Sequence, residues 1–221
     1  MIPDYEYNGK CHIRFFNCDN MDFMKEVEDK KYDLAIVDPP YGINIDGQKK
    51  VKKGKKSDRK GHKKKNWDKN IPTSKYFEQL FRVSKNKIIW GANYFVKHLK
   101  EGHKGWIIWD KAQHGLTMSD CELAYSNFDK PTRIYTKNRV ILIHEGETIH
   151  PTQKPIALYR WILQNYAKKG DKILDTHGGS MTLARACYEE GFDLDIMELD
   201  KEYFDTAVQK FKEHVSQYKL F

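Results

Sequence analysis

The sequence predicts an α/β fold with a mostly parallel, doubly wound sheet, and two observations lead to this prediction. Short apolar runs alternate along the chain with longer segments whose apolar residues recur at helical spacing. Parallel neighbours need a long crossover, usually a helix, so this alternation is typical of a parallel sheet. In addition, acidic residues stand at the ends of three predicted strands, at Asp38, Asp175 and Glu198. Ligands of open α/β sheets bind outside the carboxyl ends of the strands, so we expect a site there.

The first half of the chain supplies four predicted strands and three predicted helices. Apolar runs predict strands over residues 12–16, 32–37, 87–90 and 106–109. Between them, Met21 to Val27 predicts a helix that Asp19 or Asn20 caps. Residues 74–83 and 93–99 also have helical apolar spacing.

The second half continues the alternation after one irregular stretch. Apolar residues alternate with polar ones between 120 and 143, which predicts antiparallel strands or a hairpin. The remaining predicted elements are helix 156–167, strand 172–174, helix 182–190, strand 194–197 and helix 202–215. Gly191 is well suited to end helix 182–190, because glycine favours the left-handed cap.

Length and composition indicate one globular domain over residues 1–221. The chain is 39% hydrophobic, and no linker divides it. No stretch approaches the ~20 apolar residues of a membrane span, and residues 1–10 lack the apolar core of a secretion signal. We therefore expect a cytoplasmic protein with no membrane contact. The four cysteines have no paired spacing, which predicts reduced thiols and no metal site.

The net charge of +8 is concentrated in one segment. Residues 46–69 contain eleven Lys and one Arg against three Asp, or +9, so the rest of the chain carries −1. We expect this insertion to be flexible on its own and to contact nucleic-acid phosphates, so that binding weakens with salt. The candidate contacts are Lys49, Lys50, Lys52, Lys53, Lys55, Lys56, Arg59, Lys63, Lys64 and Lys65. Trp67 is expected to anchor the end of the segment to the core.

Asp38-Pro39-Pro40-Tyr41 leaves the end of predicted strand 32–37 and is suited to holding a flat ring that bears an amine. Pro40 restricts Pro39 to extended backbone, which points a carbonyl outward. That carbonyl and the Asp38 carboxylate can accept hydrogen bonds from an exocyclic –NH2, and Tyr41 offers a face for stacking.

A second candidate site is the turn after strand 172–174, where Gly178 and Gly179 precede a helix. Such a turn lets a ligand approach the backbone closely, and Glu198 lies at the end of the next predicted strand, where ribose hydroxyls are bound in dinucleotide-type folds. The full dinucleotide fingerprint is not met, because Met181 stands where another Gly is expected. Before helix 156–167, Thr152, Gln153 and Lys154 place a hydroxyl, an amide and a cation near a helix N-terminus, a combination suited to a small zwitterion.

Together, Asp38-Pro39-Pro40-Tyr41, the His-Pro-Thr-Gln-Lys-Pro segment 150–155 and the Gly-rich turn resemble the S-adenosylmethionine-dependent amino-methyltransferases of DNA. Their order is the permuted one called the β class, and the resemblance runs from about Phe16 to Ala207, most similar to short phage and prophage members. It implies a Rossmann-like methyltransferase fold with circularly permuted motifs, S-adenosylmethionine as cofactor and DNA as partner. It also implies site-specific methylation of the kind found in restriction-modification.

The resemblance assigns roles by position. Asp38 and the Pro39 carbonyl would bind the target amine beside the cofactor, Pro40 would stiffen the loop, and Tyr41 would stack on the flipped base. Glu198 would bind the ribose, and Asp19, with the Cys18 backbone, the adenine amine. The remaining cofactor contacts implied are Thr152, Gln153 and Lys154 at the methionine carboxylate, and Asp175, His177, Gly178, Gly179, Ser180 and Thr182 along the methionine side.

Two departures from the family pattern bear on the cofactor. Thr176 and His177 replace a Pro-Phe pair, and Met181 replaces a second Gly. His177 can still stack, and its imidazole is expected to add pH dependence. Met181 must avoid positive φ or accept strain.

The resemblance favours N6 of adenine as the target, because N4-cytosine enzymes more often carry Ser in place of Asp38. The alternatives are N4-cytosine methylation, an inactive DNA-binding protein that keeps the fold, and an RNA substrate. Sequence recognition is expected from residues 112–149, with Gln113, Arg133 and Arg139 as candidate base contacts, from the Lys-rich segment, or from a second subunit in a homodimer.

Overall fold

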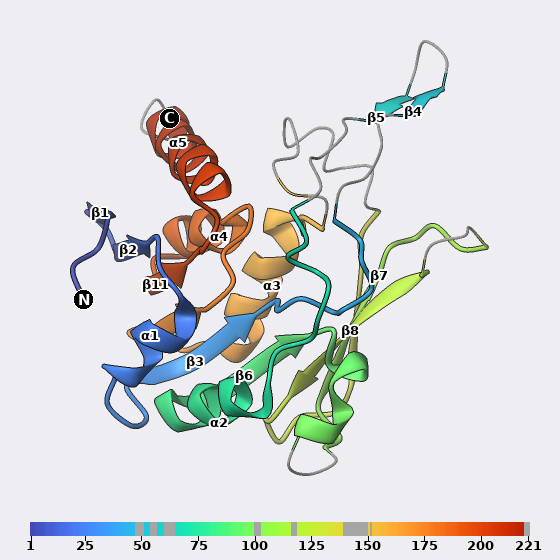
Figure 1. Ribbon diagram of the computed structural model, residues 1–221, viewed down its shortest axis with the longest axis horizontal. Coiled ribbons are helices and arrows are strands. Elements are labelled where there is room, and N and C mark those ends of the chain that lie inside the picture. The colour runs from blue at the N-terminus through green and yellow to red at the C-terminus, as the bar shows by residue number, and fades with distance from the viewer. Residues whose placement is uncertain are drawn as a thin grey trace.

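A computed structural model of the protein describes residues 1–46, 51–53, 57–59, 65–99, 103–115, 119–138, 150 and 152–218, with the backbone alone for 51–53, 57–59 and 218. Within these residues, nine strands form one sheet in the order β1-β2-β11-β10-β3-β6-β8-β7-β9 (Figure 1). These strands are β1 (Tyr5–Asn8), β2 (His12–Phe16), β3 (Tyr32–Val37), β6 (Ser84–Trp90), β7 (Trp106–Asp110), β8 (Cys121–Ser126), β9 (Arg133–Thr136), β10 (Lys172–Asp175) and β11 (Asp193–Met197).

The centre of the sheet is parallel, as predicted. Strands β2, β11, β10, β3 and β6 pair in parallel in that order, and β8 runs antiparallel between β6 and β7. The helices are α1 (Asn20–Lys25), α2 (Ser74–Val83), α3 (Ile156–Tyr166), α4 (Thr182–Glu190) and α5 (Lys201–Tyr218). They give the sheet the Rossmann-like, doubly wound architecture that the alternation of elements indicates.

Each face of the sheet has its own core, because successive side chains of a strand point to opposite sides. On β3, Leu34 and Ile36 pack in the cluster that contains residues of α3, α4 and α5. Ala35 and Val37 pack in the cluster that contains residues of α1 and α2. The near-continuous apolar run of β3 is therefore explained by burial on both faces.

Several elements differ from the sequence predictions. Strand β1 was not predicted; it pairs antiparallel with β2 at the edge of the sheet. The helix predicted over 93–99 is wrong: two short 3-10 turns, η2 (Ala92–Tyr94) and η3 (Val96–His98), occupy this stretch, and Phe95 between them is not helical. In the Lys-rich segment, β4 (Val51–Lys53) and β5 (Ser57–Arg59) pair only with each other. The predicted apolar strand residues 140–143 lie outside the described residues.

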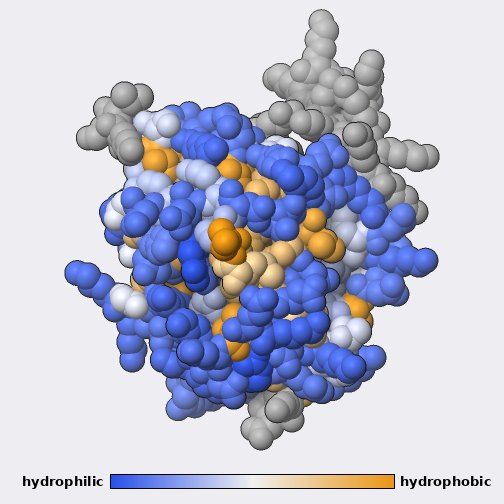
Figure 2. Space-filling view, turned by 60° about the vertical axis from the view of Figure 1, so that its left-hand side comes forward, coloured by the Kyte–Doolittle hydropathy of each residue, from blue (hydrophilic) through white to orange (hydrophobic). Residues whose placement is uncertain are grey.

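The surface agrees with a chain rich in charged residues. Figure 2 shows a face dominated by hydrophilic side chains, with hydrophobic ones gathered near its middle. In the described part of the chain, no helix has the length and apolar character needed to cross a bilayer. Trp67 is partly buried and packs on the core, as expected, and Cys11 and Cys187 are buried as free thiols.

Candidate active site

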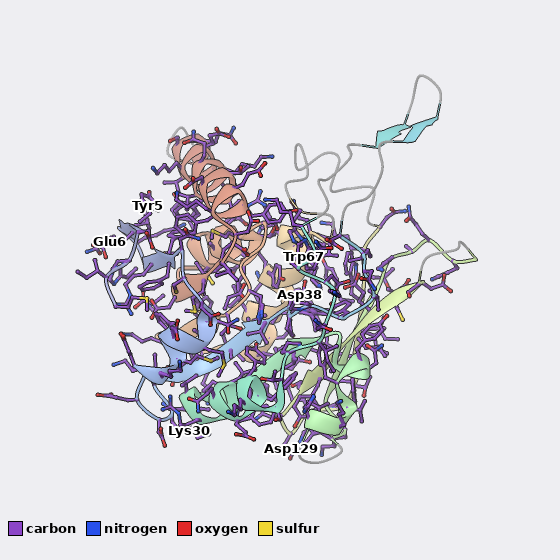
Figure 3. All side chains as sticks on the ribbon, in the orientation of Figure 1. Tyr5, Glu6, Lys30, Asp38, Trp67 and Asp129 are labelled. Atoms are coloured by element: carbon purple, nitrogen blue, oxygen red, sulfur yellow. The ribbon has the colours of Figure 1, made fainter. Side chains whose placement is uncertain are left out.

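A cavity of about 550 Å³ lies outside the carboxyl ends of β3 and β10. Its wall includes both the Asp38–Tyr41 loop, which follows β3, and the Gly178–Gly179 turn, which follows β10. These strands are parallel neighbours, so their exits meet at one edge of the sheet. Figure 3 shows Asp38 and Trp67 together at this edge, whereas Lys30, which precedes β3, lies at the opposite edge. The volume is typical of a small-molecule site.

The structure brings all of the predicted catalytic and cofactor-contacting residues to this cavity. Its lining includes Cys18, Asp19, Asp38, Pro39, Pro40, Tyr41, Thr152, Gln153, Lys154, Asp175, His177, Gly178, Gly179, Ser180, Thr182 and Glu198. Of the predicted phosphate contacts, Lys65 also lines it. Lys49, Lys50, Lys55, Lys56, Lys63 and Lys64 lie outside the described residues, and the side chains of Lys52, Lys53 and Arg59 are not described.

The Asp38 carboxylate has partners on both oxygens. Lys154 Nζ donates to Oδ2 at 2.5 Å, and the Tyr41 hydroxyl donates to Oδ1 at 2.6 Å. The Lys154 side chain is fully buried and that of Asp38 is 17% exposed. Burial raises the pKa of Asp38, while the Lys154 ammonium opposes this effect and favours the carboxylate.

The position of Lys154 differs from the expected one. Its ammonium contacts the carboxylates of Asp38 and, at 3.1 Å, Glu122. A cation held between two partly buried carboxylates is not available to a cofactor carboxylate, so the structure argues against the contact expected of Lys154. Thr152 and Gln153 keep their places in the wall of the cavity, where the Thr152 hydroxyl is 3.0 Å from His150 Nδ1.

Tyr41 is held in a stack of aromatic rings. Its ring lies 5.1 Å from that of Tyr94 at an interplanar angle of 16°, and Tyr94 is 40% exposed. Gly91 permits this arrangement, because a Cβ on it would lie 2.1 Å from Tyr41 Cε1. One face of the Tyr41 ring is thus already covered by Tyr94, a residue that no sequence pattern singled out.

The structure of the glycine turn explains one of its two departures from the family pattern, Met181. A Cβ on Gly178 would lie 3.0 Å from the carbonyl oxygen of Met197, so glycine allows the turn to pack on β11. Met181 takes the left-handed conformation, with φ 50°, as the N-cap of α4. This conformation costs about 1–2 kcal/mol for a residue with a Cβ. Its buried side chain lies in the core, so Met181 accepts strain that a Gly would not have.

Three of the acidic residues in the cavity wall, Asp19, Asp175 and Glu198, are the expected cofactor contacts. Burial raises the pKa of Asp175 to about 8, so this group keeps its proton near neutral pH. The Glu198 carboxylate accepts hydrogen bonds from the amides of Gly179 and Asp200, both at 2.8 Å. Asp19 caps α1 by accepting from the Met21 amide at 2.7 Å. The Glu198 and Asp19 carboxylates therefore have fixed positions, which is required for selective contact with polar groups of one ligand.

His177 does not behave as the sequence suggested. Its ring is partly buried in the wall of the cavity, with Nε2 3.1 Å from the Asn20 amide nitrogen and Nδ1 2.9 Å from Thr176 Oγ1. Burial lowers the pKa of His177 to about 3, so the imidazole is neutral at physiological pH. The expectation that it adds pH dependence is wrong for this range.

Lys65 is also placed differently from its prediction as a phosphate contact. Its ammonium pairs with Asp200 at 2.6 Å and Glu202 at 3.0 Å, and only 17% of the side chain is exposed. It also lies over the Tyr203 ring. A cation paired in this way is not free to neutralise a phosphate, because two carboxylates of the same chain already compensate its charge.

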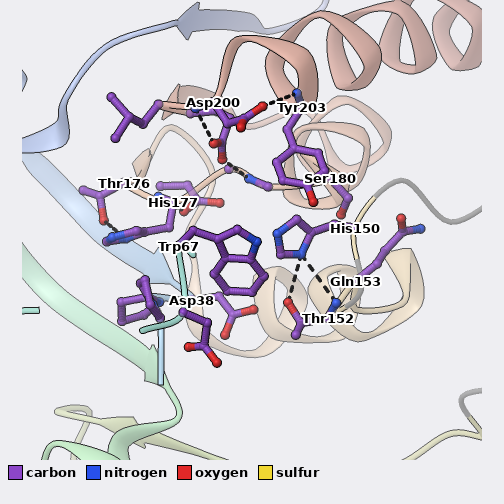
Figure 4. Close-up of a pocket in the computed structure, with 18 of the residues that line it drawn as sticks. Asp38, Trp67, His150, Thr152, Gln153, Thr176, His177, Ser180, Asp200 and Tyr203 are labelled. Carbon is purple, nitrogen blue, oxygen red and sulfur yellow. Dashed lines mark hydrogen bonds between the residues drawn. The ribbon is translucent and has the colours of Figure 1, made fainter. Parts of the chain in front are cut away.

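Trp67 belongs to the cavity as well as to the core. Figure 4 shows its indole beside His150, between Asp38 and Tyr203. The ring centroids of Trp67 and His150 are 4.7 Å apart, and those of His150 and Tyr203 are 4.9 Å apart. The end of the Lys-rich segment thus forms a wall of the same cavity that contains the glycine turn.

Arg133, one of the candidate base contacts, lies at the edge of the sheet opposite the cavity. Arg133 begins β9, which runs parallel to β7, and β7 has the same direction as β6 and β3 because β8 reverses between them. Arg133 is therefore at the amino edge, opposite the cavity. Gln113 follows the carboxyl end of β7, at the same edge of the sheet as the cavity but outside its lining, and Arg139 lies outside the described residues.

The sequence reasoning missed several residues that surround the site. His150, Tyr159 and Asp200 line the cavity. His150 belongs to the 150–155 segment and Tyr159 to the predicted helix 156–167, whereas Asp200 lies between predicted elements. Glu122 had no signal beyond its position in an alternating strand. Asp68 ends the Lys-rich segment and was counted only as a charge.

The parallel sheet, the two-sided helices and the cavity at the strand ends define a Rossmann-like methyltransferase fold. A family model described as DNA methylase, of the N6/N4 methyltransferases, matches residues 94–209, more than half of the chain. The chain belongs to this family. The type II methyltransferase M.HpaI of Haemophilus parainfluenzae is 26% identical over 234 residues, which cover 85% of this chain and 70% of that protein.

Solved structures with this fold include three similar chains. The M1.HpyAVI–SAM complex has a TM-score of 0.61 and 21% identity, covering 90% of this chain and 99% of that one. TTHA0409 from Thermus thermophilus, complexed with S-adenosyl-L-methionine, has a TM-score of 0.57 and 14% identity, with 91% and 95% covered. The PvuII DNA methyltransferase, which is cytosine-N4-specific, has a TM-score of 0.57 and 10% identity, with 93% and 92% covered.

Proposed function

We propose that this protein transfers the methyl group of S-adenosylmethionine to the N6 amine of adenine in DNA. The observation that carries the proposal is the shared cavity, which places the amine-binding loop Asp38–Tyr41 and the Gly178–Gly179 turn within one small-molecule site. Transfer requires donor and acceptor to be held in line in one site, and such positioning contributes much of the rate of a bimolecular reaction.

The chain's own groups fit the cofactor. Its ammonium is matched by the buried Asp175 carboxyl, its ribose hydroxyls by Glu198, and its adenine amine by Asp19, which stand along the same cavity. Thr152 and Gln153 are the proposed partners of its carboxylate. When bound, the cofactor supplies an electrophilic methyl group on a sulfonium.

Asp38 and the Pro39 carbonyl orient the target amine. The nitrogen lone pair forms the new bond to carbon while the electron pair of the broken carbon–sulfur bond returns to sulfur, and one amine proton then leaves. Asp38 is an acceptor for that proton because Lys154 favours its ionised form. The base must first leave the duplex, which costs a few kcal/mol. Stacking on the Tyr41–Tyr94 pair, worth about 1–3 kcal/mol per base, offsets much of this cost.

The finer assignments are proposals of the same kind. Adenine is favoured over cytosine by Asp38 in the position where N4-cytosine enzymes more often have Ser. The order of the motifs, with the Asp38 loop before the glycine turn, supports the permuted β class, and the resemblance of these motifs favours a phage or prophage type of member. We propose one methyltransferase domain, with residues 112–149 for target recognition, the remaining Lys-rich side chains for DNA phosphates, and a homodimer as the assembly.

The test is nucleoside analysis of unmethylated DNA after incubation with the protein and S-adenosylmethionine. We expect N6-methyldeoxyadenosine, and methylation-sensitive sequencing of the same DNA then gives the recognition sequence. N4-methylcytosine as the sole product would overturn the adenine assignment. Cofactor binding by calorimetry without any methylated product would favour an inactive DNA-binding protein, and a matched RNA duplex tests the third alternative.

Asp38→Ala tests the role of the loop. We expect methylation to be lost while cofactor binding persists, because Asp38 contacts the amine and only borders the cofactor. Equal loss of cofactor binding and methylation would show that Asp38 is misassigned. Leu199→Ala, a change at an exposed side chain in the rim of the cavity, is a control for general disturbance.

A further inference from the structure

A chain of four charged side chains of alternating sign runs from the Asp38 loop into the protein. Lys154 Nζ lies 2.5 Å from Asp38 Oδ2 and 3.1 Å from Glu122 Oε2, and Lys111 Nζ lies 3.0 Å from Glu122 Oε1. The side chains of Lys111 and Glu122 are 8% and 20% exposed. Neither residue is among the described residues that line the cavity.

Four separate elements supply this charge chain, so local sequence does not account for it. Asp38 follows β3, Lys111 follows β7, Glu122 belongs to β8, and Lys154 precedes α3. Its formal charges sum to zero, and each inner charge has an opposite neighbour. Buried ions are tolerated when they are paired and hydrogen-bonded, whereas removing one partner leaves an uncompensated charge.

The geometry explains why Lys154 needs Glu122. If Asp38 were the sole partner of the buried Lys154 ammonium, the ammonium would hold the Asp38 carboxylate away from any other hydrogen-bond donor. Glu122 shares that ammonium and also lies 3.5 Å from the Tyr41 hydroxyl, the second donor to Asp38. Lys111 in turn compensates Glu122. Lys154, Glu122 and Lys111 together therefore fix the two groups that donate to Asp38, which are the Lys154 ammonium and the Tyr41 hydroxyl. The Asp38 carboxylate can still accept a further hydrogen bond.

We propose that Glu122 and Lys111 are positioning residues for methyl transfer, which act through Lys154 and Tyr41 to hold the Asp38 carboxylate oriented toward the target amine. This inference rests on the proposed function, because it assigns a purpose to Asp38. It adds two residues that neither contact the cavity nor belong to the motifs that identify the family resemblance.

Other charges and hydroxyls also face Asp38 and remain in every variant tested. They are Tyr41, Tyr76, Tyr159, Lys154 and Asp175. Because these groups are the same in every variant, a change in kcat or in the titration of Asp38 can be assigned to the substitution of Glu122. The pKa of Glu122 is lowered to about 2 in spite of burial, because Lys154 and Lys111 favour its ionised form, so it carries a full negative charge throughout the assay range.

The experiment first measures methylation by the parent protein and then compares Glu122→Gln with it. We expect kcat to fall about 10- to 100-fold, the effect of a misplaced reacting group, with the cofactor Kd unchanged within about twofold. Lys111→Met should lower kcat in the same way, and Lys111→Arg should restore it because the ion pair is kept. Glu189→Gln is the matched control, since Glu189 is an ion-paired, buried carboxylate on α4 that the site does not use.

A second readout needs neither cofactor nor DNA. Carbon NMR of protein labelled in its aspartate carboxyls, with the Asp38 signal assigned by its loss in Asp38→Asn, gives the titration of Asp38 directly. Loss of the negative neighbour in Glu122→Gln should move this titration to lower pH, because the Glu122 charge raises the pKa of Asp38. Glu189→Gln should leave it unchanged.

Three results would overturn the inference. One is a kcat for Glu122→Gln within twofold of the parent. Another is loss of kcat together with cofactor affinity and a lower Tm than that of Glu189→Gln, which would mean a merely structural role. The third is an Asp38 titration that does not move. An inactive parent protein would instead refute the proposed function, and the inference with it, before any variant is compared.

Discussion

The buried carboxylate of Asp68 accepts a hydrogen bond from the backbone amide of Tyr41, 27 positions earlier in the chain, at 2.7 Å. The same carboxylate accepts from the amides of Gly42 at 2.9 Å, Ile43 at 3.2 Å and Ile45 at 2.9 Å. Asp46, at the other end of the Lys-rich segment, accepts from the amide of Lys65 at 3.0 Å. The two ends of that segment are thus fastened to each other and to the loop that contains Asp38 and Tyr41.

This relationship predicts that Asp68→Ala disturbs both stability and methylation. The variant leaves several backbone donors without their acceptor, and each unsatisfied buried donor costs about 1–3 kcal/mol. We expect a lower free energy of unfolding in urea and a reduced kcat. Asp29→Ala is the matched control, because Asp29 pairs with Arg82 at the surface and such pairs contribute little. Equal effects of the two substitutions would contradict the role given to Asp68.

Asp175 predicts a pH dependence of stability for the cofactor-free protein. Its pKa is about 8 in the folded protein and near 3.8 when unfolded, so between these values the folded state binds more protons. The stability that Asp175 contributes is therefore complete below about pH 4, is lost progressively as pH rises, and is gone above about pH 8. Urea unfolding at pH 6 and 8 should show a smaller loss with pH for Asp175→Asn than for the parent. Parallel slopes for the two proteins would refute the prediction.

The pKa of His177 predicts a pH dependence of stability at acid pH that has the opposite direction to that of Asp175. Its pKa is about 3 in the folded protein and near 6.5 when unfolded, so the unfolded state binds more protons between these values. Its contribution to stability is present above about pH 6.5 and is lost as pH falls toward 3. His177→Phe should unfold at lower pH than the parent when both are followed by circular dichroism. Between pH 6 and 8 the two methylation profiles should have the same shape, and a limb near pH 6.5 in the parent alone would count against this.

The ion pairs of Lys65 predict that this residue belongs to the wall of the cavity and does not contribute to the salt dependence of DNA binding. Because Asp200 and Glu202 already compensate its charge, Lys65→Ala should leave the slope of log K against log salt for DNA unchanged. Lys52→Ala, at a proposed phosphate contact, should reduce that slope by about 0.9. Filter binding over a series of salt concentrations measures both. A reduced slope for Lys65→Ala would restore it as a phosphate contact.

The accuracy of the sequence predictions follows from how local each signal is. Strand β3 and helix α3 were predicted well because their apolar residues are dictated by burial and recur with the period of the element. Strand β1 was missed because Tyr5–Asn8 is half exposed at the sheet edge, so little burial marks it. The two 3-10 turns were predicted as one helix because their apolar spacing is similar to that of an α-helix. Gly91 before them takes the left-handed conformation, but a glycine in the sequence does not indicate which type of helix follows.

The sequence by itself determined the order of strands and helices, the two loops that leave β3 and β10, and the residue types offered there, since each depends on a few neighbouring residues. Tertiary structure alone decided which charges meet: it paired Lys154 with Asp38, paired Lys65 with Asp200 and Glu202, and desolvated the His177 ring enough to keep it neutral. The physical reason is that ion pairing and desolvation depend on distances between side chains far apart in the chain, and no local pattern encodes those distances.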